Sequence, residues 1–88
     1  MTEDARRIEF PCAYPVKVLG ENRDSFADAV VELTRRHAPE ITAEHVQVRA
    51  SRAGTYCAVT ITIRATGETQ LRELHETLKA HPLVRLVL

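Results

Sequence analysis

The stretch that decides the fold runs from Thr55 to Ala65 and reads T-Y-C-A-V-T-I-T-I-R-A. From Cys57 onward its odd-numbered positions are apolar: Cys57, Val59, Ile61, Ile63 and Ala65. Its even-numbered positions are mostly polar: Tyr56, Ala58, Thr60, Thr62 and Arg64. A period of two residues is typical of a half-buried β-strand. The pattern predicts a strand whose odd-numbered side chains point into the core and whose even-numbered side chains point outward.

A second alternating segment, Glu44–Ser51, comes just before this strand, with Val46, Val48 and Ala50 on one side. The connection Arg52-Ala53-Gly54 is short, and Gly54 suits a turn that needs a positive φ. Ser51 is placed to close the turn. The two segments therefore predict an antiparallel hairpin.

A helical pattern precedes the hairpin. Apolar or half-apolar residues recur at helical spacing at Phe26, Ala29, Val30, Leu33 and His37. Asp24 or Ser25 is a suitable N-cap, and Pro39 prevents continuation. These signals predict a helix that ends at about His37.

A second helical pattern follows the hairpin. Leu71, Leu74 and Leu78 form its apolar stripe, and the Thr66 hydroxyl is placed to cap its start. Pro82 ends it, and the segment Leu83–Leu88 is apolar enough for a final strand.

The first strand is predicted within Phe10–Gly20, where Tyr14, Val16 and Val18 alternate with other residues. Because Pro11 and Pro15 cannot donate hydrogen bonds, regular pairing is expected mostly from Val16 to Leu19.

The resulting order is β-α-β-β-α-β. It predicts an α+β, ferredoxin-like fold, with two helices on one face of a four-stranded antiparallel sheet in the spatial order 4-1-3-2. One domain is expected over residues 8–88. The polar tail, residues 1–7, is expected to be disordered.

Composition narrows the class of protein. The chain has 88 residues, with 12 basic side chains balancing 12 acidic ones, so no overall field attracts nucleic acid or anionic membrane. The tail lacks the apolar stretch of a signal peptide, and no apolar run is long enough to span a bilayer. A cytoplasmic protein without membrane association is expected.

No catalytic, metal or cofactor motif is apparent. Cys12 and Cys57 lie in predicted strands and are expected to be buried thiols. The four histidines lack metal-ligand spacing, and no nucleophile is adjacent to a suitable base in sequence. A binding or regulatory role without a metal or cofactor is therefore favoured over an enzymatic one.

The sheet face without helices is the widest candidate surface. Ten residues are expected to point outward there: Lys17, Leu19, Gln47, Arg49, Tyr56, Thr60, Thr62, Arg64, Arg85 and Val87. Four of these side chains are cations and none is an acid. This surface is either a solvated face, a self-association surface, an anion site or a nucleic-acid platform. Single-stranded RNA needs two or three stacking aromatics on such a sheet, and only Tyr56 is available, so a nucleic-acid-binding module is disfavoured.

A small hydrolase resembling acylphosphatase is the least favoured alternative. Such an enzyme needs a glycine-rich first loop with an arginine that holds the phosphate. The corresponding loop, Leu19–Arg23, contains one glycine and places Glu21 where an anion would lie. Arg23 is the only support for this alternative.

Several short segments together resemble a known family. They are E-F-P at Glu9–Pro11, Lys17-Val18 with Gly20, R-H-A-P at Arg36–Pro39, S-x-x-G-x-Y at Ser51–Tyr56, I-T-I-x-A-T at Ile61–Thr66, Gln70, and V-R-x-V-L at Val84–Leu88. The chain resembles the YbeD-like family of small uncharacterised bacterial proteins over residues 8–88. The tail and both cysteines fall outside that pattern.

The resemblance implies a fold similar to the ACT domain, a small-molecule-sensing regulatory module. ACT-like domains often pair edge to edge into an eight-stranded sheet and bind an effector near the loop after the first strand. By position, that loop contains Gly20, Glu21, Asn22 and Arg23. The expectation is a homodimeric regulatory or adaptor domain that binds a small-molecule effector or a partner protein.

Overall fold

The computed structural model describes residues 9–88. Its elements follow the predicted order: β1 (Cys12–Glu21), α2 (Phe26–His37), η1 (Ala43–His45), β2 (Val46–Ala50), β3 (Tyr56–Ala65), α3 (Glu68–Lys79) and β4 (Val84–Val87). The predicted disordered tail, residues 1–7, lies outside the described residues. The predicted strand from Glu44 is wrong at its start, because Ala43–His45 form a 3₁₀ turn that leads into β2.

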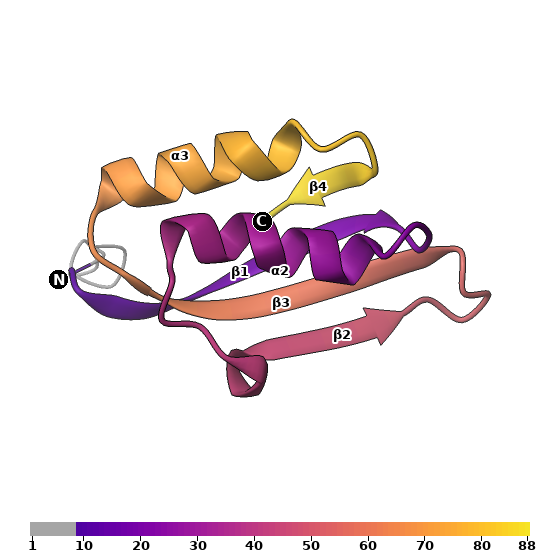
Figure 1. The fold of residues 1–88 in the computed structure, drawn as a ribbon, viewed down its shortest axis with the longest axis horizontal. Coiled ribbons are helices and arrows are strands. Elements are labelled where there is room, and N and C mark those ends of the chain that lie inside the picture. Colours follow the sequence, from indigo (N-terminus) through magenta and orange to yellow (C-terminus); the bar gives the residue numbers. More distant parts are fainter. Residues whose placement is uncertain (1–8) are drawn as a thin grey trace, which may run out of the picture.

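The four strands form one antiparallel sheet in the order β2-β3-β1-β4. Both helices lie on the same face of this sheet, and the opposite face has no covering element among the described residues (Figure 1). The α+β, ferredoxin-like architecture and its strand order are therefore confirmed.

The core lies between the helices and the sheet. Cys57, Val59, Ile61, Ile63 and Ala65 of β3 are all buried, which confirms the predicted orientation of this strand. Val16 and Val18 of β1 join them from the neighbouring strand. The helices contribute Phe26, Val30, Leu74 and Leu78.

The expected restriction of β1 pairing by proline is wrong. β1 pairs with β3 along its whole length, from Cys12 opposite Ala65 to Glu21 opposite Tyr56. Alternate residues of a strand bond the same neighbour, and Lys17 bonds Leu88 on the β4 side. The missing N–H of Pro15 therefore faces the β4 side, where it interrupts no bond to β3.

Neither helix uses the predicted side-chain cap. Ser25 is the N-cap of α2 but makes no capping hydrogen bond, and both Asp24 and Ser25 have positive φ, 54° and 57°. Ahead of α3, the Thr66 hydroxyl and N–H both donate to Gln70 Oε1, at 3.3 and 2.8 Å. Gln70 Nε2 in turn donates to the His37 carbonyl at 2.8 Å. Gln70 thus connects the end of α2 to the start of α3.

Candidate functional site

The loop after β1, the predicted effector site, is held by contacts within the protein. Asn22 donates from its backbone to the Thr55 carbonyl at 2.9 Å and from Nδ2 to the Gly54 carbonyl at 3.0 Å. These bonds attach the loop to the turn between β2 and β3, where Gly54 has the predicted positive φ of 77°. The Ser51 hydroxyl closes that turn by accepting from the Tyr56 N–H at 3.1 Å, as predicted.

The charged groups of this loop are paired with one another. Arg23 Nε contacts Glu21 Oε1 at 3.0 Å, and Arg23 Nη1 contacts Asp24 Oδ2 at 2.7 Å. Arg85 of β4 pairs with the other oxygen of Glu21. A small anion at Arg23 would have to displace two carboxylates that are already in place.

Gly20 has a packing role. It is buried, and a Cβ at this position would overlap the ring of Phe26 and lie 2.6 Å from the Leu83 carbonyl oxygen. The space that a side chain would occupy is therefore filled by the first residue of α2. The absence of a side chain here lets α2 approach β1 closely.

The uncovered sheet face carries its side chains in rows, because residues paired across a ladder point to the same side. One row crosses all four strands through Arg49, Ala58, Leu19 and Leu86. The next row consists of Gln47, Thr60, Lys17 and Leu88, the last joined to Lys17 by two backbone hydrogen bonds. On the other side of the first row, Tyr56 lies opposite Glu21. The structure thus brings together four of the predicted surface residues: Lys17, Arg49, Tyr56 and Arg85.

The expected position of Val87 on this face is wrong. The register between β1 and β4 shifts between Leu19 and Gly20, so that Arg85 is an extra residue in β4. The bulge reverses the faces beyond it. Val87 packs against the core, whereas Leu86 and Leu88 point outward with 47% and 58% of their surface exposed. The sequence alternation alone gave no signal for these two leucines.

Arg64, which was also predicted to lie on this face, stands apart from these four residues. It is six residues beyond Ala58 in β3, or about 20 Å along an extended strand. There β3 extends past the end of β2, and the Glu40 carboxylate accepts a hydrogen bond from the Arg64 N–H at 3.1 Å. This contact satisfies a backbone group that the sheet leaves unpaired.

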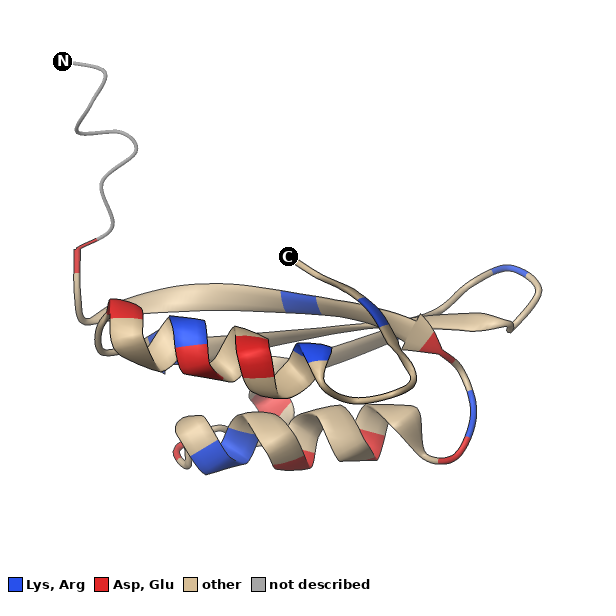
Figure 2. Cartoon of the chain, turned by 90° about the horizontal axis from the view of Figure 1, so that it is seen from above, with Lys and Arg blue, Asp and Glu red and all other residues tan. Residues whose placement is uncertain are grey.

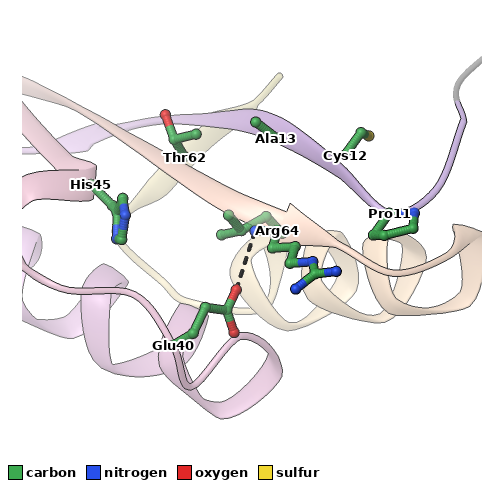
Figure 3. Close-up of a pocket in the computed structure, with 8 residues that line it drawn as sticks. Pro11, Cys12, Ala13, Glu40, His45, Thr62 and Arg64 are labelled. Carbon is green, nitrogen blue, oxygen red and sulfur yellow. Dashed lines mark hydrogen bonds between the residues drawn. The ribbon is translucent and has the colours of Figure 1, made fainter.

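A shallow hollow of about 440 Å³ lies beside Arg64 (Figure 3). It is lined by Pro11, Cys12, Ala13, Glu40, His45, Thr62, Ile63 and Arg64. Cys12 and His45 lie at opposite ends of it, and His45 Nδ1 accepts from the Thr42 N–H at 3.0 Å. Two polar side chains here, Glu40 and His45, accept backbone hydrogen bonds, and the hollow brings no thiol against a base.

Three of the four histidines, His37, His45 and His81, have local structural contacts. His37 Nε2 lies 3.0 Å from Thr77 Oγ1 and connects the two helices. His81 Nδ1 accepts from the Leu83 N–H at 3.1 Å, and its ring meets Phe26 edge to face at 6.1 Å. Within residues 9–88, no three histidine, cysteine or acidic side chains gather closely enough to hold a metal ion.

The two cysteines are free thiols with different surroundings. Cys57 is 2% exposed, and burial raises the pKa of its thiol. Cys12 is half-buried at the start of β1, so the expectation of a buried thiol is confirmed for Cys57 and wrong for Cys12.

We predict that a thiol reagent at neutral pH modifies one cysteine per native chain, Cys12, because the thiolate is the reacting species and Cys57 forms it reluctantly. Titration with an aromatic disulfide, monitored by absorbance, measures this. The second thiol should react only in denaturant, and Cys12→Ser should abolish the fast phase. Two fast thiols in the native protein would contradict the assignment.

The inner side of β2 is an apolar surface that sequence reasoning did not identify. Val48 pairs with Val59 and so points to the helical side of the sheet, yet it is 55% exposed. A groove between α2 and β2 continues this surface, lined in part by Val31, Ala43 and Val46. The helices therefore leave the edge strand β2 uncovered.

Comparison with known proteins establishes the family. Residues 5–88 match the family model described as "Protein of unknown function (DUF493)". The chain belongs to the DUF493/UPF0250 family of small bacterial proteins. A UPF0250 protein of Nitrosomonas europaea is 39% identical over 88 residues, covering all of both chains. One of Azotobacter vinelandii is 45% identical, covering 96% of this chain and 92% of its own.

A solved structure has the same architecture as this DUF493/UPF0250 chain. The solution structure of protein HP0495 from H. pylori superposes with a TM-score of 0.71, covering 100% of this chain and 94% of that protein. The two sequences are 15% identical, so the likeness concerns the fold.

The α-helices of the described residues are α2 and α3, and neither is long and apolar enough to cross a membrane.

Proposed function

We propose that this chain is a non-enzymatic regulatory or adaptor module that acts as a cytoplasmic homodimer and binds a partner protein. The observation that carries the proposal is the edge of β2, a strand with a free backbone side and an uncovered apolar face. The two free thiols are in keeping with a reducing compartment.

The backbone of β2 can pair with a further strand. Ser51, just after β2, bonds Tyr56 of β3, and alternate residues of a strand bond the same neighbour. Gln47 and Arg49 therefore face β3, whereas the N–H and C=O groups of Val48 and Ala50 and the C=O of Val46 face outward. The Val46 N–H bonds the Ala43 carbonyl. An unpaired row of this kind is a template for strand addition.

The other free edges carry features that oppose pairing. The half of β1 that extends past β4 presents Pro15, which has no N–H to donate. β4 has four residues and contains the bulge at Arg85. Proline, short length and bulges are the devices by which natural sheets protect their edges. β2 has neither a proline nor a bulge, so it is the edge best suited to a second copy.

Antiparallel pairing of two β2 strands, centred on Val48, would place compatible side chains opposite each other. Val48 would lie opposite Val48 of the other copy, and Gln47 would lie opposite Arg49, which separates the two arginines. The apolar side of the pair would cover Val46 and Val48, now partly exposed beside α2. Such pairing produces a continuous eight-stranded sheet with one uncovered face.

A partner protein on that face is better supported than a small anion at the loop after β1. Arg23 and Glu21 already pair with each other, and Asn22 is committed to the neighbouring turn. The uncovered face, by contrast, exposes Tyr56, Leu86 and Leu88. Exposed apolar side chains that lie together are characteristic of interaction sites.

Sedimentation equilibrium at tens of micromolar tests the dimer. We expect twice the chain mass of 9.9 kDa for the natural sequence. Val48→Pro should give a monomer, because it removes the outward N–H while leaving the bonds between β2 and β3 intact. Val48→Thr is the matched control, since it keeps both the N–H and the branched shape, and it should remain dimeric.

A natural chain that sediments at 9.9 kDa would refute the dimer. Equal behaviour of Val48→Pro and Val48→Thr would place the dimer contact elsewhere. Circular dichroism of both variants would show whether each retains the fold.

A further inference from the structure

The uncovered sheet face has an apolar centre. Leu86 and Leu88 lie beside Leu19 and Lys17 of β1, and Tyr56 is 49% exposed at the end of β3. With Ala58, which pairs with Leu19, these side chains form a patch that we call the leucine patch: Leu19, Tyr56, Ala58, Leu86 and Leu88. It spans β3, β1 and β4, on the opposite side of the sheet from the core.

Cations surround the leucine patch. Arg49 adjoins Ala58, Lys17 adjoins Leu88, and Arg85 immediately precedes Leu86. The strands contain four cations and a single acid, Glu21, which Arg23 and Arg85 already share. Lys17 and Arg49 have no ion-pair partner within residues 9–88.

Half of the acidic side chains in residues 9–88 lie on the other layer. Asp28, Glu32, Glu68, Glu73 and Glu76 all belong to the two helices (Figure 2). The sheet face is therefore positive around an apolar centre, whereas on the helices the five acids are accompanied by four cations, Arg35, Arg36, Arg72 and Lys79.

Charge decides between two occupants of the leucine patch. Stacking two copies face to face would bring Lys17, Arg49 and Arg85 of one copy against the cations of the other, and like charges placed together repel. A segment with carboxylates around large apolar side chains would instead neutralise Lys17 and Arg49 while covering the leucines. Complementary charge also speeds encounter and suppresses unsuitable partners.

We infer that the leucine patch, with Lys17 and Arg49 beside it, is a docking site for an acidic protein segment that carries large apolar side chains. This inference rests on the proposed function only in taking the chain to be a binding module. It uses the sheet face of a single copy and not the β2 edge.

A random 12-residue peptide display library provides the probe. After selection on the natural protein, we expect enriched peptides with net negative charge and at least one large apolar side chain. A synthetic peptide of the enriched sequence should then shift amide signals of β1, β3 and β4 around the leucine patch in NMR spectra, and its affinity should fall as salt rises.

Charge reversal distinguishes this site from general attraction. The double variant Lys17→Glu/Arg49→Glu should weaken binding of the synthetic peptide at least about tenfold. Arg64→Glu is the matched control, because it reverses another cation of β3 about 20 Å along the strand from Ala58, and it should change the affinity less than about twofold. Leu86→Ser should also weaken binding, with little effect on its salt dependence.

The outcomes separate the two proposals. Val48→Pro should bind the peptide with the affinity of the natural protein per chain, even as a monomer, so loss of the dimer does not remove this site. Failure to enrich acidic, apolar peptides, or an equal loss in Arg64→Glu, would overturn the inference. Tighter binding of poly-uridine RNA or of phosphatidylglycerol vesicles through Lys17 and Arg49 would also overturn it.

Discussion

Replacing Gly20 with alanine should lower the free energy of unfolding by about 2–3 kcal/mol. The added methyl group would overlap the Phe26 ring and approach the Leu83 carbonyl oxygen to 2.6 Å. Phe26 is 2% exposed and cannot swing aside, and Leu83 is held by the bond from the Glu21 N–H at 3.0 Å. Alanine also lowers the conformational entropy of the unfolded chain, which stabilises the folded state by about 0.4–1 kcal/mol. This stabilisation is smaller than the cost of the clash. Urea unfolding monitored by circular dichroism measures the difference.

A second substitution identifies the cause of the loss. Phe26→Leu removes the ring atoms that the methyl group meets, so Gly20→Ala and Phe26→Leu together should destabilise less than the sum of the two single changes, by about 1 kcal/mol. Additive losses would mean that the clash with the Leu83 carbonyl dominates. A loss below about 0.5 kcal/mol for Gly20→Ala alone would show that α2 does not pack as closely on β1 as described.

The sequence predicted the sheet well where a local pattern carried the information. The alternation in Thr55–Ala65 identified the faces of β3 because a strand repeats every two residues regardless of what lies around it. The side of β1 on which Pro15 lacks an N–H donor could not be predicted in this way. It depends on which neighbour lies on each side of β1, and that follows from the whole sheet.

The candidate site was predicted in part for the same reason. Lys17, Arg49 and Tyr56 were placed on the open face because their strands continue the alternation. Leu86 and Leu88 were missed because the bulge at Arg85 follows from tertiary contacts, in which the Glu21 N–H bonds Leu83 and the Glu21 side chain pairs with Arg85. These partners lie more than sixty residues apart, and no local pattern signals their meeting.

The exposure of Val48 could not be predicted from the alternation of its strand. The alternation correctly placed Val46, Val48 and Ala50 on the helical side of the sheet. It could not show that two helices of twelve residues each leave the β2 edge uncovered, because the coverage depends on where the helices cross the sheet. The surface proposed for the dimer is therefore a product of tertiary packing.

Truncation of Ile61 to alanine should cost about 2–5 kcal/mol, the largest single loss that we expect from a strand residue. Ile61 is 0% exposed and lies in β3, one of the two central strands, where it pairs with Val16 of β1 and Val46 of β2. The helices cover it from the other layer, so the shortened side chain leaves a cavity that its neighbours can fill only partly. Chemical unfolding in urea, analysed as a two-state transition, gives the loss.

Thr62→Ala is the matched control for this prediction, because it changes the next residue of the same strand on the opposite face. It removes a methyl and a hydroxyl group from a partly exposed side chain, and we expect a loss below about 1 kcal/mol, which reflects strand preference alone. The difference between the two variants measures the burial of one face against the other. Comparable losses would mean that both faces of β3 are covered in solution, and the leucine patch would then have no free surface to offer a partner.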